Sequence, residues 1–210
     1  MKVDFFIIGA PKSGTTSLYH YLDEHPQVEM STQKEPDYFS DAAIQKQGLY
    51  YGNNRIDTVE KYYSLFNVEG MNVIFGEASV SYLFYKNVAS DIKKYNVNVK
   101  IIIMLRNPID RAYSNYHLGV RLGSESLSFE DSLKKEIEFL EKNNDIESDG
   151  IEKFLRPRSY IAKGLYYHQI KNWFEIFSKD QILVLSTENL SKNPHQTLEQ
   201  IFNFLGLPNE

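Results

Sequence analysis

The sequence has 210 residues, of which 42% are hydrophobic and 14% aromatic, so it can bury the core of one large domain. Its net charge of -5 at pH 7 argues against general nucleic-acid binding, which favours a basic surface. No cysteine is present, and this excludes disulfides, thiol nucleophiles and Cys-ligated metals.

The N-terminus carries no signal-peptide pattern. Its apolar run is short and passes directly into a glycine-rich turn. No stretch of the chain reaches the roughly 20 apolar residues that a membrane helix requires. We therefore expect a cytoplasmic location and no membrane insertion.

The first twenty residues form the most informative stretch. Residues 3–8 are apolar and aromatic, as in a buried strand, and residues 17–24 place Leu18, Tyr21 and Leu22 at helical spacing. Between them lies a turn bounded by Gly9 and Gly14. A strand, a glycine-rich turn and a helix N-terminus direct unpaired backbone N–H groups and the helix dipole to one point. The sequence therefore predicts a phosphate-binding loop.

This loop departs from the Walker A pattern, whose lysine follows the second glycine and whose hydroxyl binds Mg²⁺. Here Thr15 occupies the position of that lysine, and the only lysine of the loop is Lys12. The best later strand ends in Arg106 rather than in an acid that could serve as a Walker B residue. The pattern favours a phosphate site without a lysine–magnesium pair, and the alternative is a coincidental Gly/Ser/Thr turn.

The rest of the chain alternates between strands and helices. We expect strands at 28–30, 72–77, 99–105 and 181–185, and helices at 108–119, 128–142, 159–177 and 194–205. One or two short helices over the sheet are expected within 42–65, and a polar, mobile segment at 143–158. The alternation predicts an α/β fold: a single domain over 1–210, with a mainly parallel central sheet flanked by helices and a P-loop-like phosphate site.

One of these helices begins with a capping-box pattern, Ser128-Phe129-Glu130-Asp131. Its apolar residues Phe129, Leu133, Ile137 and Leu140 are expected to share one face, and its many acidic residues to form a solvated face.

Three charged residues follow predicted strands. Lys12, Glu77 and Arg106 each come after an apolar run, and ligands of parallel sheets bind at the carboxyl ends of strands. We therefore expect these three side chains to meet at one rim of the sheet.

A second motif runs from Arg106 to Tyr116 and places Ser114 eight positions after Arg106. Together with the loop from Pro11 to Thr16, it resembles the two nucleotide motifs of the sulfotransferases that use 3′-phosphoadenosine 5′-phosphosulfate (PAPS). Other stretches resemble the branch that acts on carbohydrates, including the heparan sulfate N- and O-sulfotransferases. These stretches are Lys34-Glu35-Pro36 with Phe39, Gly76-Glu77 with Tyr82, Gly164-Leu165-Tyr166 with Trp173, and Glu188-Asn189-Leu190 with Phe204-Leu205-Gly206-Leu207.

The resemblance implies a role for each motif. Lys12 contacts the 5′-phosphate and the bridging oxygen, Arg106 and Ser114 hold the 3′-phosphate, and Glu77 is the general base. The loop that holds the 5′-phosphate consists of Pro11, Lys12, Ser13, Gly14, Thr15 and Thr16. The released product is 3′,5′-adenosine bisphosphate, and neither motif supplies metal ligands.

Several alternatives stay open at this point. Glu35 competes with Glu77 as the base, and Lys34 either touches the sulfonate or acceptor or only pairs with Glu35. The acceptor, a small molecule or a glycan, is not readable from the sequence. In the heparan branch a Lys/Gly/Arg-rich loop beyond the F-L-G-L segment adds nucleotide contacts, and this sequence stops at Glu210. Competing functions are a small P-loop kinase that uses ATP and a non-catalytic nucleotide- or glycan-binding module.

Overall fold

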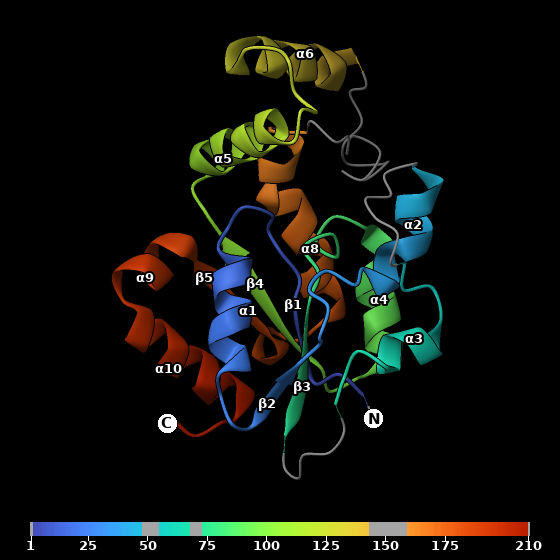
Figure 1. The fold of residues 1–210 in the computed structure, drawn as a ribbon, viewed down its shortest axis with the longest axis vertical. Coiled ribbons are helices and arrows are strands. Elements are labelled where there is room, and N and C mark those ends of the chain that lie inside the picture. Colours follow the sequence, from blue (N-terminus) through green and yellow to red (C-terminus); the bar gives the residue numbers. More distant parts are fainter. Residues whose placement is uncertain (1, 48–54, 68–72, 143–158, 210) are drawn as a thin grey trace.

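The fold is built around a five-stranded parallel sheet (Figure 1). The computed structural model describes residues 2–47, 55–67, 73–142 and 159–209. The strand order is β2-β3-β1-β4-β5, and every neighbouring pair is parallel. The strands are β1 (Phe5–Ile7), β2 (Val28–Met30), β3 (Ile74–Ala78), β4 (Lys100–Leu105) and β5 (Ile182–Ser186). The predicted α/β class with a mainly parallel sheet is confirmed.

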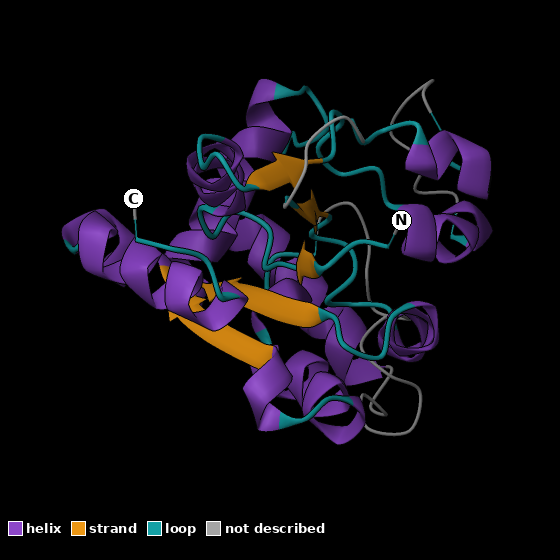
Figure 2. Ribbon diagram, turned by 90° about the horizontal axis from the view of Figure 1, so that it is seen from below, coloured by secondary structure: helices purple, strands orange, loops and turns teal. Residues whose placement is uncertain are grey.

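Helices cover both faces of this sheet, as the view from below shows (Figure 2). On one face lie α1 (Thr15–Asp23), α9 (Thr187–Lys192) and α10 (Pro194–Leu205). On the other face lie η1 (Tyr38–Ser40), α2 (Asp41–Lys46), α3 (Val59–Tyr63), α4 (Lys86–Tyr95) and α8 (Tyr166–Ile176). Two further helices, α5 (Pro108–Arg121) and α6 (Phe129–Lys142), lie at the top of Figure 1. No helix within the described ranges is long and apolar enough to cross a bilayer.

The central strand β1 supplies both cores. Phe5 and Ile7 belong to the core under α1 and α10, and Phe6 and Ile8 belong to the core under α4 and α8. All four side chains are fully buried. Alternation along a strand sends successive side chains to opposite faces, so a continuous apolar run is what a strand buried on both faces requires.

Helix ends follow the chemistry of the sequence. The side chain of Asn107 caps α5 by accepting hydrogen bonds from the N–H groups of Ile109 and Asp110, and Pro108 occupies the first turn. At the end of α10, Gly206 adopts φ 79°, and Leu207 N donates to Phe202 O at 2.8 Å. This left-handed ending is the one that favours glycine.

Two parts of the helix prediction are wrong. The helix expected at 159–177 begins only at Tyr166, because Leu165 has the non-helical angles φ -78° and ψ 64°. Only the short turn η3 (Ala162–Gly164) precedes it. In addition, α4 has no counterpart among the expected elements, although Val88, Ala89 and Ile92 form its buried face.

The short helices expected within 42–65 correspond to α2 and α3, and residues 48–54 lie outside the described part of the chain. The expectation for 143–158 also falls on residues that the structure does not describe.

The start of α6 is predicted correctly, but its buried face is not. Ser128 Oγ donates to Asp131 Oδ2 at 2.8 Å and accepts from Asp131 N at 3.1 Å, as expected for a capped helix. However, Ile137 is 44% exposed, whereas Ser132 and Glu136 are buried. The acidic face is therefore not solvated throughout.

Glu136 is buried because its carboxylate satisfies three backbone donors. Oε2 accepts from Tyr160 N at 2.6 Å and from Ile161 N at 2.8 Å, and Oε1 accepts from Ala162 N at 2.9 Å. These contacts tie α6 to the segment that leads into α8. The helical periodicity of the sequence cannot predict these contacts, because the three N–H groups lie more than twenty residues after Glu136 in the chain.

We expect Glu136→Ala to lower the free energy of unfolding by about 2–4 kcal/mol, because it leaves three backbone donors unpaired. Urea unfolding followed by circular dichroism measures this change. The control is Glu138→Ala, an exposed position two residues further along the same helix, which should change stability by less than about 0.5 kcal/mol. Equal effects of the two substitutions contradict the proposed anchoring role of Glu136.

Candidate active site

The phosphate loop connects β1 to α1 and has an unusual backbone. Lys12 and Gly14 adopt positive φ angles of 64° and 81°, and Gly14 is the N-cap residue of α1. A Cβ atom on Gly9 would lie 3.0 Å from Leu83 Cβ and 3.2 Å from Val80 O. The loop therefore presses closely against the chain that follows β3. Its curvature leaves the first N–H groups of α1 available for an anion.

The hydroxyl residues of the loop are placed differently. Ser13 and Thr15 are buried, whereas Thr16 is exposed. Thr187 Oγ1, at the start of α9, lies 2.7 Å from Ser13 O and 2.9 Å from Leu105 O. Its single proton can serve either carbonyl, so Thr187 links the loop to the end of β4. Nothing in the local pattern around Thr187 indicates this contact.

Arg106 brings the second motif to the loop, as the sequence predicts. Its Nη1 donates to the carbonyl oxygen of Lys12 at 3.4 Å, and its own carbonyl accepts from the Tyr166 hydroxyl at 3.0 Å. Ser114 lies half-buried on α5, the helix that begins just after Arg106. The two predicted nucleotide motifs are therefore adjacent in space.

The surroundings of Lys12 are cationic. Burial is the largest cause that lowers the pKa of Lys12, and the positive charge of Arg121 is the next. Arg106 and Lys34 lower this pKa as well, whereas Glu35 raises it. In the described part of the chain, the charged groups that act most strongly on Lys12 are thus three cations and one carboxylate, although the net charge of the chain is -5. Such a cluster attracts an anion. Arg121, at the far end of α5, is not among the residues predicted for the site.

A loop beside β3 carries the predicted substrate residues. Glu35 N donates to Ala78 O at 2.8 Å, which fixes the loop at the carboxyl end of β3. Lys34 Nζ pairs with Glu35 Oε1 at 2.5 Å, and their side chains are 20% and 43% exposed. Lys34 therefore makes the ion pair that the sequence analysis considered, at a place that also faces Lys12.

Asp37, in the same loop, is a candidate that the sequence analysis missed. Its backbone N–H donates to Ser79 Oγ at 3.0 Å, and its Oδ1 accepts from Ser81 Oγ at 2.5 Å. Burial raises the pKa of Asp37 to about 6. Both Glu35 and Asp37 have positive φ angles, 59° and 55°, which residues other than glycine rarely adopt. Such outliers often gather at functional sites.

Glu77 lies inside β3 rather than after it, which corrects the expectation that all three charged residues follow their strands. Ala78 still pairs with Ile7 in the sheet, so the strand continues past Glu77. The Glu77 side chain is fully buried, and its Oε2 accepts hydrogen bonds from Tyr62 and Tyr82 at 2.7 and 3.0 Å. Lys12 and Arg106 thus meet at the rim of the sheet, whereas Glu77 is buried within β3 beside that rim.

Burial is also the main cause that raises the pKa of Glu77, to about 7. Hydroxyl groups of Ser79, Tyr62 and Tyr82 oppose this shift, and the nearby charge of Asp37 adds to it. A carboxyl group with a pKa near neutrality is suited to accept and release a proton at physiological pH.

Comparison with known proteins agrees with this geometry. The family described as "Sulfotransferase domain" matches residues 2–210. Mouse carbohydrate sulfotransferase 15 is 30% identical over 249 residues, covering 97% of this chain and 43% of that protein. Bifunctional heparan sulfate N-deacetylase/N-sulfotransferase 1 of Caenorhabditis briggsae is 30% identical, covering 98% of this chain and 23% of that protein. The chain therefore spans less than half the length of these relatives.

Solved structures show the same relationship. The crystal structure of a sulfotransferase from Alicyclobacillus acidocaldarius matches with a TM-score of 0.83 and 34% identity, covering 100% of this chain and 83% of that one. A mouse sulfotransferase, SULT7A1, complexed with PAP, shares the fold with a TM-score of 0.56 and 18% identity, covering 99% of this chain and 59% of that one. The resemblance identified from the two sequence motifs is confirmed, and the chain belongs to the sulfotransferase domain family.

Proposed function

We propose that this chain transfers the sulfuryl group of PAPS to a hydroxyl or amine of an acceptor, with a carbohydrate as the acceptor class. The contact between Arg106 Nη1 and the Lys12 carbonyl carries this proposal, because it joins two anion-binding motifs at one rim. A donor with phosphate groups at both the 5′ and the 3′ positions requires two such motifs side by side. A simple mononucleotide requires only one.

The residues of the rim fit the two ends of this donor. The backbone of the phosphate loop and the start of α1 suit the 5′-phosphate, since free N–H groups and a lysine gather there. Arg106 supplies a planar fork of donors for the 3′-phosphate, and Ser114 on the following helix supplies a hydroxyl.

Sulfuryl transfer depends mainly on positioning and on charge stabilisation, as phosphoryl transfer does. The bond between the sulfur and the bridging oxygen breaks, and negative charge grows on the departing 5′-phosphate. Lys12 stabilises that charge, and its cationic neighbours favour binding of the polyanionic donor. The acceptor oxygen or nitrogen forms the new bond to sulfur and loses a proton to a general base.

We assign the base to Glu77, with Glu35 as the competing carboxylate. The pKa of Glu77, about 7, supports this assignment. Its full burial means that a neighbouring side chain must move before an acceptor reaches it. Glu35 is 43% exposed and faces Lys12, so it requires no such movement. Substitution of the true base should lower kcat strongly, and substitution of the other carboxylate should not.

The acceptor class rests on the names of the relatives, a carbohydrate sulfotransferase and a heparan sulfate N-sulfotransferase. A cytoplasmic location stays a prediction, and a relative from Dictyostelium discoideum that is named a membrane-associated sulfotransferase points the other way. Fractionation of cells that express the full-length protein decides between the two locations.

The choice of nucleotide tests the proposed 3′-phosphate site. We expect 3′,5′-adenosine bisphosphate to bind about 30- to 1,000-fold more tightly than 5′-AMP, because only the bisphosphate engages Arg106 and Ser114. Isothermal titration calorimetry without magnesium measures both affinities. Equal affinities, or tight magnesium-dependent binding of ATP, would favour a kinase and contradict the proposed function.

Substitution separates the roles of the two cations of the rim, Lys12 and Arg106. Arg106→Ala should mainly weaken the binding of donor and bisphosphate product, because the 3′-phosphate is unchanged during the reaction. Lys12→Ala should lower kcat more than it lowers bisphosphate affinity, because charge on the leaving phosphate grows only in the transition state. Steady-state kinetics together with calorimetry test this, and the reverse pattern shows that the two roles are exchanged.

Two glutamine variants identify the general base. Glu77→Gln keeps the shape of the side chain but cannot accept a proton, so kcat should fall by at least about 100-fold. Bisphosphate affinity should stay within about threefold of the wild-type value. Glu35→Gln is the matched variant and should reduce kcat much less. An inactive Glu35 variant beside an active Glu77 variant would show that Glu35 is the base.

A further inference from the structure

We propose that Tyr62 and Tyr82 are positioning residues that hold Glu77 by one carboxylate oxygen, so that the other oxygen receives the proton of the acceptor. This inference rests on the proposed role of Glu77 as general base. It adds two side chains that lie outside both nucleotide motifs, and one of them, Tyr62, lies on a helix that the sequence analysis does not connect with the site.

The geometry at Glu77 is asymmetric. Oε2 accepts from the Tyr62 hydroxyl at 2.7 Å and from the Tyr82 hydroxyl at 3.0 Å, whereas Oε1 is buried without a hydrogen-bond partner. The Ser79 hydroxyl, just after β3, is the remaining polar group close enough to lower the pKa of this carboxyl, and its oxygen accepts from Asp37 N at 3.0 Å. All three side chains are fully buried. Buried polar atoms are nearly always paired, so an unpaired carboxylate oxygen requires an explanation. An oxygen that is kept free to bind the acceptor supplies that explanation.

The direction of the Tyr82 hydrogen bond is fixed by a second contact. The backbone N–H of Phe39 donates to the Tyr82 hydroxyl oxygen at 3.3 Å. Because an N–H group can only donate, Tyr82 accepts there and keeps its own proton for Glu77. Its ring also meets Phe6 and Phe39 edge to face, at centroid distances of 5.9 Å in both cases. Tyr82 therefore has little freedom to turn away from Glu77.

Tyr62 is held by the aromatic ring of Tyr38 and by the capped start of its helix. Tyr38 stacks on it with a centroid distance of 4.5 Å and an interplanar angle of 13°. Thr58 Oγ1 caps α3 by accepting from Lys61 N at 3.3 Å. Both contacts fix the orientation of the phenol toward the sheet.

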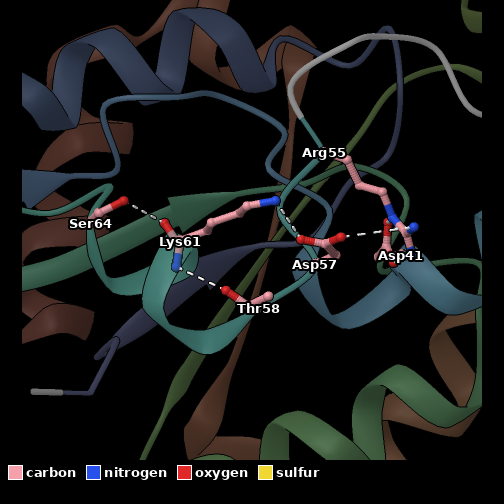
Figure 3. A network of polar contacts seen from close by, with 6 residues as sticks. All are labelled: Asp41, Arg55, Asp57, Thr58, Lys61 and Ser64. Atoms are coloured by element: carbon pink, nitrogen blue, oxygen red, sulfur yellow. Dashed lines mark hydrogen bonds and ion pairs between the residues drawn. The ribbon is translucent and has the colours of Figure 1, made fainter.

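A polar network on the surface links α3 to α2 (Figure 3). Arg55 bridges Asp41, at the start of α2, and Asp57, which in turn pairs with Lys61 at 2.7 Å. Individual exposed ion pairs of this kind contribute little to stability. Together they form one chain of ion pairs from Lys61, on the helix that carries Tyr62, to Asp41 on α2. The position of Tyr62 is therefore specified from both its buried and its exposed side.

These contacts have a chemical consequence for proton transfer. When the acceptor attacks sulfur, its O–H or N–H bond breaks and the proton forms a new bond to a Glu77 oxygen. Oε2 already accepts two hydrogen bonds, so the proton goes to Oε1. The Ser79 hydroxyl and the two phenols stabilise the charged carboxylate, against the raising effects of burial and of Asp37. Tyr95, on α4, faces the same group and adds no hydrogen bond to it.

Removal of either hydroxyl should therefore raise the pKa of Glu77 further. In Tyr62→Phe and Tyr82→Phe, we expect the acidic limb of the kcat profile to move upward by about one pH unit. Affinity for 3′,5′-adenosine bisphosphate should stay within about threefold, because both hydroxyls donate to Glu77 and not to the phosphate loop. Stopped assays with PAPS from pH 5 to 9 and calorimetry measure the two quantities.

The matched control is Tyr19→Phe. The Tyr19 hydroxyl is also a buried donor, to Ser31 O at 2.6 Å, but it lies in the core on the other face of the sheet. This variant should lose stability to a similar extent without any movement of the acidic limb. A limb that moves in Tyr19→Phe as much as in the other two variants would overturn the positioning role.

A second measurement separates this inference from the role of Glu77. The carboxyl carbon of Glu77, labelled with ¹³C and assigned by its loss in Glu77→Gln, reports its own titration by NMR without turnover. An unchanged titration in both Phe variants overturns the hydrogen-bond clamp, whatever the activity. A shifted titration combined with an active Glu77→Gln variant supports the clamp but overturns its role in proton transfer, because the base is then a different group.

Discussion

The site depends on two backbone hydrogen bonds that extend the β1–β4 pairing beyond the end of β1. Met104 N donates to Gly9 O at 2.7 Å, and Ala10 N donates to Met104 O at 2.6 Å. They join the first residues of the phosphate loop to the last residues of β4. Because Arg106 follows β4 immediately, its guanidinium lies within reach of the Lys12 carbonyl. The two nucleotide motifs are thus held together by the sheet itself, and flexible side chains only complete the contact.

The same arrangement separates charge within the molecule. The chain is acidic overall, yet Lys12 faces Lys34, Arg106 and Arg121. Glu35 pairs with Lys34 at this rim and stays partly exposed, whereas Asp37 and Glu77 are withdrawn from water, and burial raises the pKa of both. A site that must bind a polyanion and also accept a proton needs positive charge at the surface and a proton acceptor shielded from it.

The sheet and the two nucleotide motifs could be predicted from the sequence, because the patterns that specify them are local. The apolar run from Val3 to Ile8, the turn from Gly9 to Thr16 and the Asn107-Pro108 helix start each determine their own backbone, and a parallel sheet brings their ends to one rim. The clamp on Glu77 could not be predicted, because Tyr62 reaches it from a helix whose sequence separation from β3 carries no information on contact. Thr187 and Asp37 were missed for the same reason. The buried face of α6 was assigned wrongly because a charge, Glu136, satisfies buried backbone donors better than the apolar positions could.

The position of β1 also constrains the order in which this chain can fold. Both strands that pair with β1 lie much further along the sequence, β3 at Ile74–Ala78 and β4 at Lys100–Leu105. The contact from Thr187 to Ser13 spans 174 residues. During synthesis, β1 leaves the ribosome about 70 residues before its partner β3 and about a hundred residues before its partner β4. Closing such long loops slows folding, so we expect the phosphate loop, although first in the sequence, to be among the last parts of the molecule to reach its final shape.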